Sequence, residues 1–354
     1  MTSFIGRNSI NNLSEILKEE NAKNILVFTG KKSFDVIKTI IEKELIACDI
    51  TYYNNFSTNP KKEEIDVAIE ELESNFDIII AIGGGSVIDF AKAYRYYTKP
   101  LKLIAIPTTC GTGSEATQFA VIYIEGVKHS LDEPSILPDY AIIDSQFVEN
   151  NPKYLKACTA MDAYCQAIES YWAVGSTEES RKYARQAIIL CRDNLVKYVN
   201  SNNPMTAENM ALASYLAGKA INISKTTAAH ALSYKITSKY GIPHGHAVAL
   251  SIAGLFEINT QITSITNQDP RGVNFVKKRI DEIKELIQDT TNDYFYNLLT
   301  KINLEIDLQK LKITDKTLII NSVNTQRLNN NPRSLTKNDL NFILTHKENI
   351  NARY

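Results

Sequence analysis

The first 150 residues alternate short runs rich in β-branched residues with segments that have the apolar spacing of amphipathic helices. The strand-like runs are NILVFTG, CDITYYN, DIIIAIG, LKLIAIPTT and YAIIDSQF, and the helical segments between them include SFDVIKTIIEKEL, EEIDVAIEELES and VIDFAKAYRYY. This alternation is typical of parallel strands joined by crossover helices. Such α/β sheets bind their ligands at the carboxyl ends of the strands.

From about residue 151 the pattern changes to long amphipathic segments. Examples are KYLKACTAMDAYCQAIESYWAV, EESRKYARQAIILCRDNLVKYV and AENMALASYLAGKAI. Their apolar residues recur at helical spacing, so this half is predicted to be almost wholly helical. The sequence therefore predicts an α/β domain over residues 1–150 and an all-α domain over residues 151–354.

The composition argues against several classes of partner. The 354 residues carry 39 Lys and Arg against 40 Asp and Glu, a net charge of -1, so neither nucleic acid nor an anionic membrane surface is an expected partner. The N-terminal MTSFIGRNSINNL lacks the apolar centre of a signal peptide, and no run approaches the roughly 18 apolar residues of a membrane span. Five cysteines without CxxC pairing suit a reducing compartment. We expect a cytoplasmic protein.

Three consecutive glycines stand at a predicted strand-to-helix turn, in AIGGGSVIDFAKA over residues 81–93. Without a Cβ the backbone can approach an anion closely, and the free N–H groups of the following helix point at it. The turn is therefore a candidate phosphate-binding loop. The alternative is a tight connection without a ligand.

A second loop of small residues, IPTTCGTGSEAT over residues 106–117, follows another predicted strand. Its hydroxyl groups belong to Thr108, Thr109, Thr112 and Ser114, and they are predicted to line a cofactor or a substrate. The alternative is that these hydroxyls bond to their own backbone.

Candidate metal ligands lie in the helical half. Asp162 and Gln166 are four residues apart in AMDAYCQAIES, so both project from one face of a helix. His230 falls within a helical pattern, and His244 stands in a turn flanked by Pro and Gly. A carboxylate with two imidazoles suits Fe²⁺ or Zn²⁺ better than Mg²⁺. The alternatives are a polar helix face and structural histidines.

These motifs together resemble the iron-containing (group III) alcohol dehydrogenase family. The segments GGGSVID, IPTTCGTGSEAT, LPDYAIIDSQF, AMDAYCQAIESYWAV and HALSYKITSKYGIPHGHA occur in the family's order and spacing, and the resemblance covers nearly the whole chain. It implies a dehydroquinate synthase-like architecture, in which a Rossmann-like dinucleotide-binding domain precedes a helical domain and a metal-bound active site lies in the cleft between them. It also implies a homodimer.

The resemblance assigns roles to individual residues. It implies that the pyrophosphate loop is Gly83, Gly84, Gly85 and Ser86, that Asp89 lies near the adenosine ribose, and that Thr108, Thr109 and Thr112 line the inner end of the coenzyme. It implies the metal ligands Asp162, Gln166, His230 and His244, and we expect the two histidines and Tyr234 to take part in catalysis.

Two positions depart from the family's pattern. The family usually has histidine where this chain has Gln166, which is a neutral oxygen donor and a weaker ligand. It commonly has a proton-relaying histidine where this chain has Tyr234. Tyr234 or a metal-bound water is therefore expected to relay the proton.

The end of the strand NILVFTG bears on the choice of coenzyme. Family members that prefer NAD tend to have an aspartate there, whereas this chain has Gly30, Lys31 and Lys32. Losing a carboxylate and gaining cations favours NADPH, with NADH as the alternative coenzyme. The alternative is that the two lysines are solvated residues at the start of a helix.

The reaction that the resemblance implies is hydride transfer from a reduced nicotinamide to a carbonyl carbon, with a divalent metal polarising the oxygen. The segments QAIESYWAVGSTEESRKYA, NISKTTAAHALSY and GIPHGHAVAL are similar to those of the family branch that contains phosphonoacetaldehyde reductases. These enzymes form 2-hydroxyethylphosphonate. Lys225 and Thr226, just before His230, are candidates for binding the anionic tail of such a substrate.

Other substrates and functions stay open. A sugar-phosphate or triose-phosphate carbonyl meets the same requirement, and a general dehydrogenase of small unphosphorylated alcohols is a further possibility. Dehydroquinate synthases and glycerol or glycerol-1-phosphate dehydrogenases share the architecture. A binding protein that has lost its metal is the alternative from another class, and Gln166 is the feature that favours it.

Overall fold

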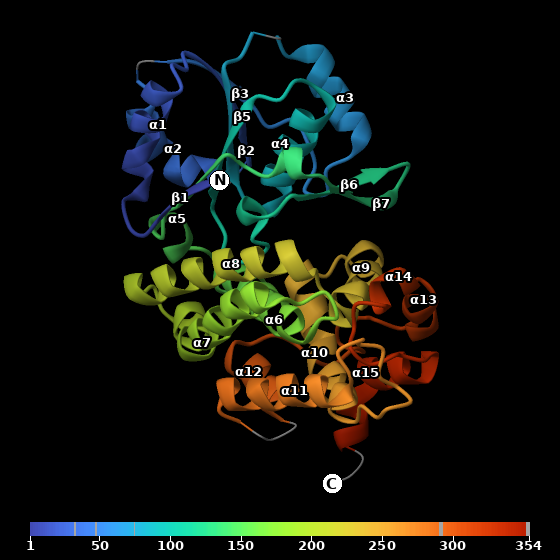
Figure 1. The fold of residues 1–354 in the computed structure, drawn as a ribbon. Coiled ribbons are helices and arrows are strands. Elements are labelled where there is room, and N and C mark those ends of the chain that lie inside the picture. Colours follow the sequence, from blue (N-terminus) through green and yellow to red (C-terminus); the bar gives the residue numbers. More distant parts are fainter. Residues whose placement is uncertain (32, 47, 74, 290–292, 352–354) are drawn as a thin grey trace. The chain divides into compact units, whose positions relative to one another are not determined.

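The computed structural model describes residues 1–31, 33–46, 48–73, 75–289 and 293–351 (Figure 1). The chain divides into two compact units. The first contains residues 1–151 and 202–218, and the second contains residues 152–201 and 219–354. The sequence predicted one boundary after residue 150; the structure also groups residues 202–218, which include most of helix α8 (Pro204–Ser224), with the first unit.

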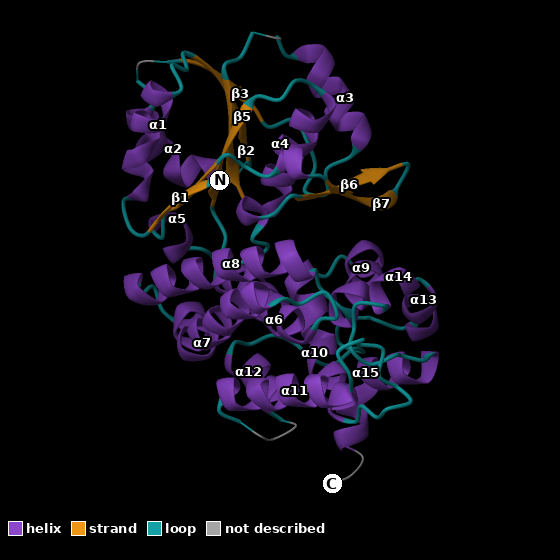
Figure 2. Cartoon of the chain, viewed as in Figure 1, coloured by secondary structure: helices purple, strands orange, loops and turns teal. Residues whose placement is uncertain are grey.

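The first unit is built on a parallel sheet of six strands, which confirms the predicted α/β fold class. The spatial order is β1-β8-β5-β4-β2-β3. In that order, the bounds are Thr2–Ile5, Tyr140–Ile143, Lys102–Pro107, Ile78–Gly83, Asn24–Thr29 and Asp49–Tyr53. A separate antiparallel hairpin of β6 (Phe119–Ile124) and β7 (Val127–Asp132), which the sequence did not predict, is also visible in Figure 2.

Apolar side chains on both faces of this sheet are buried, which explains why its central strands read as continuous hydrophobic runs. Alternate residues of β4 face different cores: Ile78 and Ile80 pack in one cluster, whereas Ile79 and Ala81 pack in the other. The helices of this unit are α1 (Leu13–Glu19), α2 (Ser33–Glu44), α3 (Lys62–Glu71), α4 (Gly85–Tyr97) and α5 (Gln146–Glu149), with 3₁₀ turns at Ser9–Asn12, Ser114–Ala116 and Pro134–Ile136.

The chain changes direction across the sheet between β2 and β4. From β2 it continues outward to β3, and from β4 it continues the other way to β5 and β8. Thr29 pairs with Ile82 in register, and the Gly30 amide donates to the Ile82 carbonyl oxygen at 3.4 Å. The loops after β2 and β4 therefore meet at a topological switch point, where parallel α/β sheets bind their ligands.

The second unit is helical, as predicted. Its helices are α6 (Lys153–Trp172), α7 (Glu178–Asn200), α9 (Ala228–Tyr240), α10 (His244–Thr260), α11 (Val273–Ile287), α12 (Tyr294–Lys301), α13 (Lys316–Asn321), α14 (Thr325–Leu328) and α15 (Lys337–Asn351). Helix α10 is buried along most of its length and packs against α6, α9 and α15. In the part of the chain that the structure describes, no helix combines the length and apolar character needed to cross a membrane.

Candidate active site

Three of the predicted metal ligands meet in the second unit. One ligand atom from each of Asp162, His230 and His244 lies within 4.8 Å of the others. The Nε2 atoms of His230 and His244 lie 3.2 and 3.9 Å from Asp162 Oδ1. Asp162 and His230 are buried, whereas the His244 side chain is 33% exposed. The cluster therefore has one open side, at His244.

A glycine allows helices α6 and α10 to approach closely enough to form this cluster. A Cβ on Gly245 would lie 1.9 Å from the Cys158 carbonyl oxygen and 2.8 Å from Asp162 Cβ. No side chain fits at such distances, so the start of α10 rests directly on α6. This contact places His244, the first residue of α10, beside Asp162.

The charges of the cluster support one another. Burial raises the pKa of Asp162, but His244 and His230 lower it further, so the net pKa is below the usual range. Burial lowers the pKa of His230, but Glu169 and Asp162 raise it, and the result is about 9. The site thus keeps a carboxylate ionised where a cation would bind.

Glu169 is a functional residue that the sequence reasoning missed. It is fully buried, and Oε1 accepts hydrogen bonds from the Thr227 amide at 3.1 Å, the Thr227 hydroxyl at 2.6 Å and the Ala229 amide at 2.9 Å. Its Oε2 bonds to His230 Nδ1, which leaves Nε2 facing Asp162. Such a carboxylate fixes the tautomer of a metal-ligating histidine. The spacing of Asp162, Gln166 and Glu169 by four and three residues was the available signal.

The donor set fits the predicted metal. One carboxylate and two imidazoles suit Fe²⁺ or Zn²⁺. Gln166 is buried one helical turn from Asp162, and its Nε2 donates to Asp162 Oδ1 at 3.3 Å. It would bind a metal through Oε1 of the same amide; its role as a ligand stays a prediction.

Tyr234 lies at the exposed side of the cluster. Its ring stacks on that of His244 with centroids 5.8 Å apart and an interplanar angle of 3°. Its hydroxyl accepts a hydrogen bond of 2.5 Å from Arg327 Nη1. Burial raises the pKa of Tyr234, and Arg327 only partly opposes this, so the phenol stays protonated at neutral pH.

The two small-residue loops of the first unit also lie together. Gly84 precedes helix α4, and a Cβ on Gly85 would come within 2.7 Å of Thr112 Cγ2. A Cβ on Gly84 would be 3.5 Å from Thr109 Oγ1, and the Thr108 amide donates to the Gly83 carbonyl oxygen at 3.0 Å. The first N–H groups of α4 have no partner within the helix, so this is a suitable place for a pyrophosphate.

Two neighbouring residues on α4 make contacts that the sequence did not reveal. The Ser86 hydroxyl donates to the Thr58 carbonyl oxygen. The Asp89 carboxylate accepts from Ser114 Oγ at 2.5 Å and from the Val121 amide at 3.0 Å. Asp89 thus ties α4 to the second loop and to β6, and its predicted role near the ribose remains a prediction.

The remaining predicted residues lie in loops. Gly30 follows β2, and its carbonyl oxygen accepts from the Phe34 amide at 3.3 Å. Lys31 is exposed, and Lys32 lies outside the described residues. Lys225 and Thr226 lie in the linker between α8 and α9, where Lys225 is exposed and has a φ of 61°. Their anion-binding role stays a prediction.

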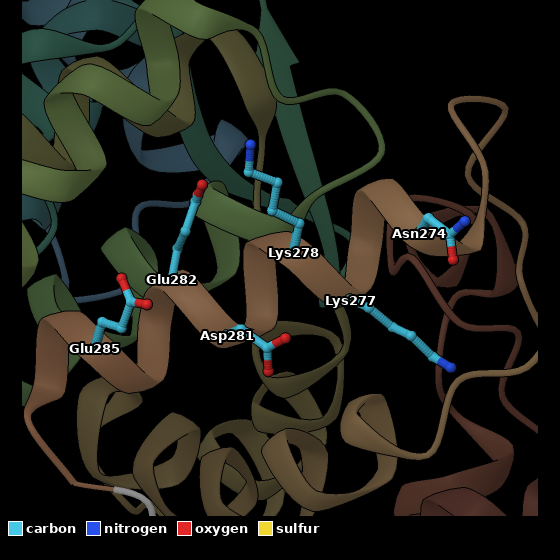
Figure 3. A pocket seen from close by; sticks show the side chains of 6 residues that line it. All are labelled: Asn274, Lys277, Lys278, Asp281, Glu282 and Glu285. Atoms are coloured by element: carbon cyan, nitrogen blue, oxygen red, sulfur yellow. The ribbon is translucent and has the colours of Figure 1, made fainter.

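A surface hollow on α11 has a different character. Its lining residues are Asn274, Lys277, Lys278, Asp281, Glu282 and Glu285, and Figure 3 shows that these side chains project from one helix. None of them belongs to the metal cluster or to the coenzyme loops. A hollow lined by one charged helix is an ordinary solvated surface.

Comparison with known proteins places the chain in a family. Residues 2–145 match the family described as "Iron-containing alcohol dehydrogenase", and residues 156–347 match "Fe-containing alcohol dehydrogenase family, C-terminal". A phosphonoacetaldehyde reductase of Streptomyces viridochromogenes is 29% identical over 301 residues, which are 76% of this chain and 75% of the relative. An NAD-dependent methanol dehydrogenase of Bacillus methanolicus is 30% identical over 307 residues, 77% of this chain and 80% of the relative.

A solved structure supports the same family assignment. The sulfoacetaldehyde reductase of Bifidobacterium kashiwanohense in complex with NAD⁺ matches with a TM-score of 0.87 and 27% identity, over 98% of this chain and 96% of that chain. The family match extends through both halves of the sequence, and it includes the helices that bring Asp162, His230 and His244 together. The chain belongs to the iron-containing alcohol dehydrogenase family and is an oxidoreductase.

Proposed function

We propose that the protein reduces a small aldehyde bearing a tetrahedral anionic group, with phosphonoacetaldehyde and its product 2-hydroxyethylphosphonate favoured. The observation that carries the proposal is the cluster of Asp162, His230 and His244, which is suited to a divalent metal beside a bound carbonyl group. Two relatives support the substrate class, because one is a phosphonoacetaldehyde reductase and the other a sulfoacetaldehyde reductase. Both names describe an aldehyde with an anionic tail.

The chain's residues have separable tasks in this reaction. A bound metal supplies Lewis-acid polarisation of the carbonyl oxygen, and the reduced nicotinamide supplies the hydride. Asp162, His230 and His244 hold the cation, and Glu169 orients His230. Tyr234, stacked on His244 and protonated at neutral pH, donates the proton to the carbonyl oxygen as that group is reduced.

We further propose that NADPH is the preferred coenzyme. The loop after β2 offers the small Gly30 and the exposed Lys31, and no carboxylate that would repel a 2′-phosphate. Because relatives include an NAD-dependent enzyme and a structure with NAD⁺, both coenzymes must be compared directly. The homodimer that the family resemblance implies is likewise a proposal, which the mass of the protein in solution tests.

The test is oxidation of NADPH and of NADH by protein reconstituted anaerobically with Fe²⁺ or Zn²⁺. Phosphonoacetaldehyde is compared with sulfoacetaldehyde, fructose 6-phosphate, dihydroxyacetone phosphate and propanal. The highest kcat/KM is expected for phosphonoacetaldehyde, and His244→Ala should abolish both stoichiometric metal binding and turnover. Equal kcat/KM for propanal would refute the anionic substrate while leaving a reductase.

A second candidate function is a dehydrogenase of small unphosphorylated alcohols. The observation that favours it is the methanol dehydrogenase relative, whose identity of 30% is similar to that of the reductase relative. Methanol and butanol oxidation with NAD⁺ and NADP⁺ belongs in the same series of assays. Reduction of sugar phosphates or triose phosphates is tested by the phosphorylated carbonyls above.

A further inference from the structure

Arg327 reaches the open side of the metal cluster from a distant part of the chain. It lies on the short helix α14, which packs against α9. Its Nη1 donates to the Tyr234 hydroxyl at 2.5 Å, and its guanidinium carbon lies 4.8 Å from the centroid of the Tyr234 ring. Since Tyr234 stacks on His244, the three side chains form a continuous row from the metal ligand to the arginine.

The charge of Arg327 is not neutralised within the described part of the chain. Arg333, six residues later, pairs with Asp339 at 3.0 Å, and Arg271 pairs with Asp269 at 2.7 Å. Among the side chains that the structure describes, no carboxylate forms such a pair with Arg327, and the Tyr234 hydroxyl is a neutral acceptor. A partly buried guanidinium in this situation favours an anionic ligand.

The backbone around Arg327 is held in place. The side-chain Nδ2 of Asn330 donates to the carbonyl oxygens of Ser224 at 2.8 Å and of Thr226 at 2.9 Å, and its Oδ1 accepts from the backbone amide of Gly175 at 2.9 Å. On the other side, Gln268 Nε2 donates to the Leu328 carbonyl oxygen at 2.8 Å. Arg327 is therefore presented from an anchored segment, which reduces the entropy lost when it binds a ligand.

We propose that Arg327 binds the tetrahedral anionic group of the substrate, while the carbonyl end lies at the cluster of Asp162, His230 and His244. The inference rests on the proposed function and names the residue that makes the enzyme selective for anionic aldehydes. The guanidinium carbon of Arg327 lies 4.8 Å from the centroid of the Tyr234 ring, and that ring stacks on His244, so one aromatic ring separates the cation from the predicted metal ligand. A planar guanidinium binds two oxygens of such a group at once.

Other cationic residues of this unit are less suited to bind the anionic group of the substrate. Lys225 is exposed. Arg181 Nη1 lies 3.3 Å from both the carbonyl and the hydroxyl oxygen of Ser176, and its guanidinium lies 5.3 Å from the centroid of the Phe275 ring. The Arg185 guanidinium donates to the Tyr171 hydroxyl at 2.9 Å. None of these contacts places a cation on Tyr234 or His244.

The first test measures binding of ethylphosphonate, which carries the anionic group but no carbonyl. Isothermal titration of the metal-loaded protein is compared for the wild type, Arg327→Ala, Arg327→Lys, Lys225→Ala and the control Arg181→Ala. Loss of a charge-assisted hydrogen bond predicts that Arg327→Ala raises the Kd about 10- to 100-fold. Arg327→Lys keeps the charge but loses the two-point contact and should be intermediate, and Arg181→Ala should match the wild type.

The second test is kinetic. Arg327→Ala should raise KM for phosphonoacetaldehyde and sulfoacetaldehyde, and it should lower kcat/KM for these two aldehydes at least about tenfold more than kcat/KM for propanal. Any loss on propanal measures the missing hydrogen bond to Tyr234. Retained propanal reduction also shows that the variant is folded. An equal loss on charged and neutral aldehydes would mean that Arg327 only supports Tyr234, and it would overturn the inference.

The two hypotheses fail differently. If the wild type prefers phosphonoacetaldehyde but only Lys225→Ala weakens the binding of ethylphosphonate, Arg327 is the wrong residue and the proposed function stands. If ethylphosphonate binding depends on Arg327 but another phosphorylated carbonyl gives the highest kcat/KM, the anion site stands and the favoured substrate is wrong. If the wild type neither binds ethylphosphonate nor prefers anionic aldehydes, both are refuted.

Discussion

Replacing Glu169 with glutamine changes one oxygen for an NH₂ group at the most buried point of the candidate active site. The carbonyl oxygen of the new amide can still accept from Thr227 and Ala229, as Oε1 does now. The NH₂ group must then face His230 Nδ1, where the carboxylate accepts a hydrogen bond. Two donors cannot face each other, so His230 gives up the proton on Nδ1 and keeps the one on Nε2, the atom that faces Asp162.

The expected magnitude follows from this change of tautomer. A histidine with a proton on Nε2 cannot bind a cation through that atom, and loss of such an orienting carboxylate weakens metal binding about 10- to 100-fold. This factor corresponds to about 1.4–2.7 kcal/mol. The metal-free protein should also lose about 1.5–3 kcal/mol of unfolding free energy, because a buried charge-assisted hydrogen bond disappears.

The assay is competition for Zn²⁺ between the protein and a chelator of known affinity, between pH 6.5 and 8. Since the pKa of His230 is about 9, the metal displaces a proton over this range, and wild-type affinity should rise as the pH rises. This dependence should be weaker in Glu169→Gln, because the pKa of His230 falls with the loss of the carboxylate. Glu282→Gln, which changes a carboxylate that accepts from Tyr171 and Arg279, is the matched control. Zinc affinity in Glu169→Gln within about twofold of the wild type would refute the reasoning.

Three further substitutions test other parts of the structure. Gly85→Ala should weaken NADPH binding at least about tenfold by fluorescence titration, since its Cβ would lie 2.7 Å from Thr112 Cγ2, and Zn²⁺ affinity should not change. Gln166→His adds an imidazole beside Asp162 and should tighten Zn²⁺ binding at least about tenfold; unchanged affinity would show that position 166 does not face the metal. Burial raises the pKa of Glu115 to about 7 from its ordinary 4.5, so the folded state holds this proton more tightly and raising the pH from 4.5 to 7 lowers stability. Glu115→Gln removes this loss, so its unfolding free energy in urea should exceed that of the wild type by up to about 3 kcal/mol at pH 8 and approach it near pH 4.5.

The sequence predicted those features that a local pattern determines. Alternating strand and helix patterns predicted the parallel sheet, and the motif around Asp162, with His230 and His244, predicted the three side chains that meet. The hairpin β6–β7 was missed, because its strands are half-exposed and carry the polar residues of VKHSLD between short apolar runs.

Spacing alone did not show which of the two histidines in the HGHA turn lies beside Asp162. His244 lies beside Asp162, whereas His246, two residues later, is buried between the Tyr154 hydroxyl at 3.0 Å and the Glu305 carbonyl oxygen at 2.7 Å. Residues two apart on a helix point in different directions, so only the packing of α10 decides which imidazole faces the metal site. Contacts such as those between Arg327 and Tyr234, 93 residues apart, leave no periodic trace in a sequence.

Helix α6 provides a common reference for the metal cluster and the proposed anion site. Asp162 belongs to the cluster, and two turns further on Glu169 holds the start of α9, while the Ser170 hydroxyl accepts from Ser224 at 2.7 Å. Asn330 in turn binds the backbone of the same linker and anchors the segment that carries Arg327. Because the metal cluster and the segment that carries Arg327 are both fixed to helix α6, rigid elements set the distance between the predicted metal position and the guanidinium. We therefore expect selectivity for the length of the aldehyde as well as for its charge, with activity falling when one methylene is added to phosphonoacetaldehyde.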